Sequence, residues 1–119
     1  MAISAVRSLP AVLFLRCERE RYGVQVKFVS VHRPKRDKPY SCPCCGFFTL
    51  TTRGGYEICP VCFWEDDGQD DHDADEVRGG PNYELSLTQG RRNFAEFGAS
   101  RRQDLPHVRS PRPEEYPDE

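Results

Sequence analysis

The sequence predicts a small α+β domain that is stabilised by a metal ion. The chain has 119 residues, 30% of them charged and 37% hydrophobic, so it offers little apolar surface for a core. Small domains bury too little apolar surface to be stable by themselves, and a metal ion or disulfides often supply the missing stability. Five of the six cysteines lie within residues 42–62, and a strong helix signature follows at residues 86–98. This clustering favours a metal site over a disulfide framework, whose cysteines would spread along the chain.

Two Cys-x-x-Cys motifs form the predicted metal site. The first pair is Cys42 and Cys45 in CPCCG, and the second is Cys59 and Cys62 in CPVC. This spacing lets a tight turn, or knuckle, direct two sulfurs at one ion, and two knuckles supply the four thiolates of a closed structural zinc site. The thirteen residues between the pairs can form a β-hairpin. The predicted domain is therefore zinc-ribbon-like, with Zn²⁺ as the favoured ion and iron as the alternative.

Cys44 is an alternative ligand, because it lies two residues after Cys42 and directly before the second ligand. We expect it to pack beside the first knuckle, outside the ligand set; a thiol activated by the metal site is the sharper alternative. Cys17 stands apart and is expected to be an incidental thiol. Gly46 lets the backbone turn its amides toward a sulfur, whereas Phe63 occupies the corresponding position of the second knuckle.

Charge and composition divide the chain into three expected parts. They are a basic N-terminal arm at residues 1–38, a cysteine-rich domain at residues 39–99 and a disordered tail at residues 100–119. Residues 22–31 of the arm alternate well enough for a strand, which we expect to couple poorly to the domain.

Two β-prone runs, residues 47–52 and residues 56–59, predict the hairpin between the knuckles. The sequence Arg53-Gly54-Gly55 separates them and gives the backbone the freedom to reverse. We therefore expect these two runs to pair with each other.

The single predicted helix spans residues 87–97. Ser86 is a good N-cap, Gln89 would complete a capping box, and Gly98 supplies a left-handed residue after the last turn. The face expected to pack on the hairpin carries Leu87, Gly90, Phe94 and Phe97.

Residues 65–80 form a predicted acidic, solvated loop without periodicity. A calcium-loop pattern fails there, because Glu76 stands where the sixth position requires glycine. Aromatic anchors beside charged side chains are typical of binding surfaces. The candidate partner-binding residues are therefore Trp64, Glu65, Asp66 and Asp67. For Trp64 itself the favoured interpretation is a core residue over the hairpin, and a contact residue is the alternative.

The closed site leaves no coordination position for water or substrate, so we predict a protein-interaction module that is not an enzyme. The first alternative is a nucleic-acid-binding zinc ribbon that uses the basic arm. It is disfavoured because residues 41–90 carry ten acidic and two basic side chains, which would repel phosphates.

The second alternative is a thiol oxidoreductase or a rubredoxin-like iron protein. A redox Cys-x-x-Cys would open a helix, whereas a β-prone run follows Gly46.

The N-terminal apolar run at residues 9–15 does not predict a secretory signal, because it contains Pro10 and no small-residue cleavage site follows it. No stretch approaches the ~20 apolar residues of a membrane span. We therefore expect a cytoplasmic protein without a membrane partner.

Three segments together resemble the small bacterial cysteine-rich family named for its Cys-Pro-Cys-Cys motif. The segments are YSCPCCG, GGYEICPVCFWEDD and GGPNYELSLTQGRRNFAEFGA, which span about residues 39–99. The resemblance implies a stand-alone module with a metal site and no established activity. The chain departs from the pattern at Gln89 and Gly90, where the family usually has Glu and Ala, and Gly90 should weaken the helix by up to ~1 kcal/mol.

Overall fold

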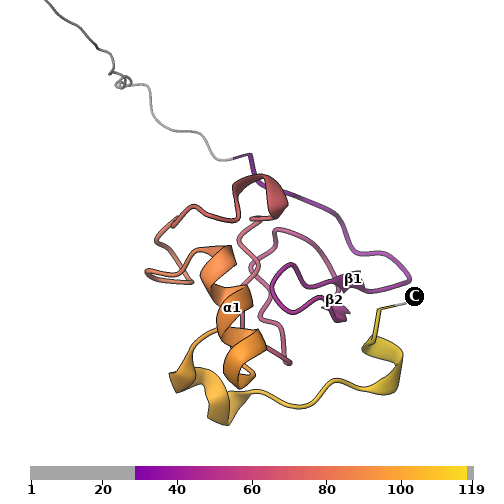
Figure 1. Cartoon of the computed structure of the whole chain (residues 1–119). Coiled ribbons are helices and arrows are strands. Elements are labelled where there is room, and N and C mark those ends of the chain that lie inside the picture. The colour runs from indigo at the N-terminus through magenta and orange to yellow at the C-terminus, as the bar shows by residue number, and fades with distance from the viewer. Residues whose placement is uncertain (1–28, 118–119) are drawn as a thin grey trace, which may run out of the picture.

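A computed structural model describes residues 29–117, which fold around the two knuckles (Figure 1). The predicted strand at residues 22–31 lies almost wholly outside this range, and its last residues, 29–31, are not in a strand. The regular elements are strands β1 (Tyr40–Ser41) and β2 (Phe48–Leu50), helix α1 (Leu87–Phe97) and the short 3-10 helices η2 (Asp71–Asp73), η3 (Arg102–His107) and η4 (Pro113–Glu115). None of the helices within residues 29–117 has the length and apolar character needed to cross a bilayer.

The two-stranded antiparallel hairpin forms around the first knuckle, so the predicted pairing of residues 47–52 with 56–59 is wrong. β1 pairs with β2, with Tyr40 opposite Leu50. Each knuckle reverses the chain by itself, so the segments that flank it pair locally, and an isolated bridge joins Ile58 to Glu65 around the second knuckle. The Glu57 carboxylate accepts hydrogen bonds from the amides of residues 51 and 52, which removes them from strand pairing.

The helix begins and ends where the sequence predicts. The Ser86 hydroxyl accepts a hydrogen bond from the Gln89 amide at 3.0 Å, and Gly98 ends the helix in the left-handed conformation with φ 97°. The capping box is incomplete, because the Gln89 side chain donates to Asn93 instead of reaching back.

The core lies between α1, β2 and the second knuckle. Leu50, Val61, Trp64 and Leu87 are buried together with the cysteines of the knuckles except Cys45, which is half-buried. Gly90 faces the Trp64 indole, and this close approach explains why a helix interior holds a glycine here.

Residues 100–117 pack on the domain, contrary to the predicted disordered tail. This segment leaves α1 and runs to the side of β2 (Figure 1). Arg109 forms a two-pronged ion pair with Glu115 at 2.9 and 2.7 Å, and Tyr116 makes an edge-to-face contact with Phe47 at 5.0 Å. Its prolines suit the extended and 3-10 backbone that lets it follow the surface.

The folded unit also begins before residue 39, where we expected the arm to end. The Val31 amide donates to the carbonyl of Gly68 at 2.8 Å, and Arg33 forms an antiparallel bridge with Arg53. His72 lies 2.6 Å from the carbonyl oxygen of Val29. Residues 29–31 therefore contact the acidic loop, and Arg33 contacts the segment between the knuckles.

Candidate metal centre

The two knuckles share one backbone arrangement. The Cys42 amide donates to the carbonyl of Phe47 at 2.8 Å, and the Cys59 amide donates to that of Trp64 at 2.9 Å. The residue after the second cysteine returns a hydrogen bond to the first cysteine's carbonyl in both knuckles, at 2.8 Å each. The same local geometry thus presents each pair of sulfurs.

Phe63 adopts the left-handed backbone that Gly46 adopts in the first knuckle. The φ angles are 70° and 85°. A bulky residue is strained in this region. The second knuckle therefore departs from the first in residue type and not in conformation. Phe63 gains a stacked contact with His107, whose ring centroid is 5.2 Å away.

The four predicted ligands come together in one cluster. The Sγ atoms of Cys42, Cys45, Cys59 and Cys62 all lie within 4.8 Å of one another. The Sγ atoms of Cys42 and Cys62 are 3.6 Å apart, and those of Cys45 and Cys59 are 3.7 Å apart. A tetrahedral zinc site with Zn–S bonds of ~2.3 Å has sulfurs about 3.8 Å apart. The donor set and its spacing therefore fit one tetrahedral ion.

Hydrogen-bond donors surround the sulfurs. The amides of Cys44, Val61 and Trp64 each lie 3.4 Å from a ligand sulfur. The Thr49 hydroxyl lies 3.0 Å from the sulfur of Cys59, in position to donate to a thiolate. Donors of this kind offset the negative charge that four thiolates concentrate around a dication.

The electrostatics of the cluster without a cation disfavour four thiolates. Burial raises the pKa of the Cys42 thiol well above its usual range. Hydrogen bonding from Cys42 and the other thiols lowers the pKa of Cys59. One thiolate therefore forms at the expense of its neighbours, and a bound dication would allow all four to ionise.

Cys44 lies outside this cluster. It is buried, and its sulfur would lie 3.4 Å from a Cβ atom at Gly90. This is the packing position beside the first knuckle that the sequence predicts. Cys17 lies outside the described residues.

Residues distant in sequence bind the outward carbonyls of both knuckles. The Arg91 side chain donates to the carbonyl of Pro43 at 2.8 Å, and the Arg109 amide donates to that of Pro60 at 3.0 Å. The Ser100 amide donates to the carbonyl of Cys62 at 2.7 Å. Sequence reasoning missed these residues and Thr49, because no motif connects them to the cysteines.

Three of the four candidate partner-binding residues are buried, so they do not form the predicted surface. Trp64 and Asp66 are fully buried, and Asp67 is 7% exposed. Trp64 fills the core, as the favoured interpretation of this residue predicted. The Asp66 carboxylate accepts hydrogen bonds from Arg53 at 3.1 Å and from the Gly54 amide at 2.6 Å. The acidic loop is therefore folded inward around an arginine.

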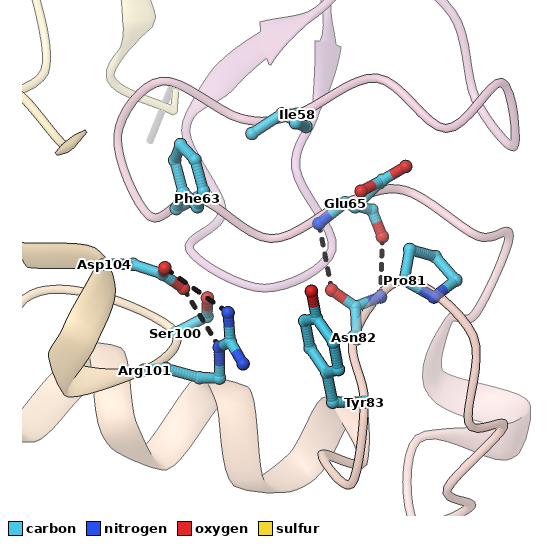
Figure 2. A pocket seen from close by; sticks show the side chains of 9 residues that line it. All are labelled: Ile58, Phe63, Glu65, Pro81, Asn82, Tyr83, Ser100, Arg101 and Asp104. Carbon is cyan, nitrogen blue, oxygen red and sulfur yellow. Dashed lines mark hydrogen bonds and ion pairs between the residues drawn. The ribbon is translucent and has the colours of Figure 1, made fainter.

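Glu65 is the accessible member of that group. Both its backbone polar atoms bond to the Asn82 amide group, at 3.1 and 2.8 Å, and its carboxylate points away from Asn82 (Figure 2). A hollow of about 230 Å³ lies beside it, with Tyr83 on one wall and the ion pair of Arg101 and Asp104 on another (Figure 2).

A family model described as "Cysteine-rich CPCC" matches residues 40–115. The chain belongs to this CPCC family. The CPCC match starts at β1 and contains both knuckles, α1 and the Arg109–Glu115 ion pair. It thus extends well past residue 99, where we expected the domain to end. No curated protein and no solved structure matches the chain.

Proposed function

We propose that the chain is a structural zinc protein that is not an enzyme and that presents a binding surface on a metal-held scaffold. The observation that carries this proposal is the cluster of four sulfurs within 4.8 Å of one another. Structural zinc contributes on the order of 10 kcal/mol or more in small modules, which is comparable to the whole stability of a typical domain. Zinc binding and folding should therefore be coupled.

The donor set supports a structural role over a catalytic one. Four protein thiolates fill a tetrahedral site, so no position remains for water or substrate. Cys42, Cys59 and Cys62 are at most 1% exposed, which also restricts access to the ion. Closed, buried thiolate sites hold chain segments together.

The experiment that tests this proposal is elemental analysis of the purified chain together with its visible spectrum. We expect one zinc per chain and no visible absorption, because zinc has a filled d shell. Removal of the ion by a chelator should abolish the folded circular dichroism signal, and added zinc should restore it. A coloured protein with one iron would favour the rubredoxin-like alternative, and a folded protein without metal would contradict the proposal.

The thiol oxidoreductase alternative lacks the helix that it needs. A redox Cys-x-x-Cys has a helix N-terminus that lowers the pKa of its first thiol. Within residues 29–117, neither knuckle opens a helix, and α1 starts at Leu87. We expect the zinc-loaded chain to show no disulfide reductase turnover with insulin as substrate, and turnover at a rate typical of oxidoreductases would overturn the non-enzymatic proposal.

A binding role needs a different surface from the one predicted from sequence. Trp64, Asp66 and Asp67 are enclosed by the fold. A partner could reach them only by unfolding the loop, at the cost of the hydrogen bonds that Asp66 accepts from Arg53 and from the Gly54 amide. The accessible charged and aromatic side chains therefore lie elsewhere.

A further inference from the structure

A basic and aromatic face lies where the segment before β1 passes the end of the C-terminal segment (Figure 1). We call it the basic-aromatic face: it is the hollow lined by Arg36, Lys38, Phe48 and Tyr116, together with the exposed Arg33 and Lys35 of the segment that leads to it. The four basic side chains are exposed and fall within six residues. Arg36, Lys38, Phe48 and Tyr116 share one hollow of about 190 Å³. Cations and aromatic rings thus line the same depression.

Arg36 is held in place. Its guanidinium donates to the carbonyls of Lys38 at 2.9 Å and Pro39 at 3.1 Å, and it lies 3.8 Å from the centre of the Tyr40 ring. The Tyr40 hydroxyl in turn donates to the carbonyl of Pro34 at 2.8 Å. A cation fixed in this way loses little conformational entropy when it contacts an anion.

The Tyr116 ring is also positioned, although it is 54% exposed. It makes an edge-to-face contact with Phe47, and the residue before it is the buried Glu115, which Arg109 holds. An exposed ring that is kept in place can serve as a platform on which another flat ring stacks. Phe48, which is half-buried, supplies a second ring in the hollow.

The acidic side chains of the domain repel an anion at the basic-aromatic face less than their number suggests. Four of the eight acids of the loop are paired within the domain: Arg53 binds Asp66 and Asp70, Arg78 binds Asp73, and Arg91 binds Asp71. Glu114 lines the hollow, and Asp37 lies within the basic run. The four cations still outnumber these two acids.

We propose that this face binds single-stranded nucleic acid. Arg33, Lys35, Arg36 and Lys38 contact successive phosphates, and a base stacks on Tyr116 beside Phe48. The charge favours an anionic polymer, and the two rings favour one with flat bases over an acidic peptide or a membrane.

The test is fluorescence anisotropy of a labelled twelve-nucleotide oligo(dT) with the full, zinc-loaded chain at several salt concentrations. We expect salt-dependent binding. Arg36→Gln should lower the slope of log affinity against log salt by about 0.7, the share of one phosphate contact on a single strand. Tyr116→Ala should weaken binding at least about fivefold without changing the slope, and Tyr116→Phe should bind like the wild type. Arg92→Gln removes an exposed charge from α1 and serves as the control.

Several results would overturn the proposal. One is no binding at 50 mM salt. A second is binding that Tyr116→Ala leaves unchanged or that polyglutamate and anionic vesicles match, since either result means general anion binding. A third is binding that is lost with residues 1–28 and insensitive to Arg36→Gln and Tyr116→Ala. Zinc content and circular dichroism of each variant separate a loss of this site from a loss of the fold.

Discussion

Gly90 lies against the indole of Trp64, so closely that a Cβ atom at position 90 would come within 3.1 Å of two ring carbons. The same atom would lie 3.4 Å from the sulfur of Cys44. Helix propensity alone predicts that Gly90→Ala stabilises the chain by ~1 kcal/mol. Because Trp64 is fully buried, it cannot move aside, and overpacking of this kind costs about 1–3 kcal/mol.

We therefore predict that Gly90→Ala lowers the free energy of unfolding, by up to about 2 kcal/mol. Chemical denaturation of the zinc-loaded protein measures it. In a Trp64→Phe background the smaller ring leaves room, so the same substitution should stabilise. If Gly90→Ala instead stabilises the wild-type protein by the ~1 kcal/mol that helix propensity predicts, the contact between position 90 and Trp64 is loose.

Arg53→Gln should destabilise the fold by about 3 kcal/mol, because it leaves the fully buried Asp66 carboxylate without its cation. Arg92→Gln, which removes an exposed charge from α1, should change stability by less than about 0.5 kcal/mol. Denaturation midpoints of the two variants test the difference. Equal midpoints would mean that the acidic loop does not depend on its internal ion pairs.

Gly46→Ala should cost about 1 kcal/mol, because the backbone there has φ 85°. No heavy atom outside the neighbouring residues would lie within 4 Å of the new Cβ, so backbone strain is the whole effect. Gly46→Asn should cost less, since asparagine tolerates this conformation. An alanine variant as stable as the wild type would show that the knuckle relaxes.

Deletion of residues 101–119 should destabilise the domain by on the order of 2 kcal/mol and speed up zinc release. The deletion removes the Arg109 amide from Pro60 and the Tyr116 ring from Phe47, each worth about 1 kcal/mol. Zinc transfer to a chromogenic chelator measures the release rate. An unchanged rate would indicate that this segment does not support the second knuckle.

Glu115→Gln should cost about 1 kcal/mol between pH 8 and pH 5.5, without a pH trend. The Arg109 guanidinium lowers the pKa of Glu115 to about 2. A lowered pKa in the folded state means that the ion pair contributes fully above the unfolded value of about 4.5 and loses its contribution as the pH falls toward 2. A cost that shrinks between pH 8 and pH 5.5 would contradict this assignment.

The knuckles and the helix could be predicted because their signals are local. The Cys-x-x-Cys spacing places two sulfurs on one turn, and Ser86 and Gly98 mark the helix ends within a few residues of sequence. The sequence shows that Gly90 is unfavourable for a helix. It does not show why a glycine stands there, because the reason is a contact with Trp64, which lies in another segment.

The rest depends on contacts between distant residues. An acidic run in a sequence predicts a solvated loop. Here Arg53 and Arg78, the only basic residues in positions 41–90, form ion pairs within this run, and the sequence does not show those pairs. The C-terminal segment has the composition of a disordered tail, yet the Pro60 carbonyl and Phe47 hold it to the domain.

The most direct test of the four-sulfur site is zinc content per chain in five single Cys→Ser variants. Cys42→Ser, Cys45→Ser, Cys59→Ser and Cys62→Ser should each lose zinc and the folded circular dichroism signal, because each removes one of the four clustered sulfurs. Cys44→Ser, which alters a buried thiol outside the cluster, should keep one zinc per chain. Zinc loss only in Cys44→Ser, or retention in all five variants, would contradict the assignment of the site.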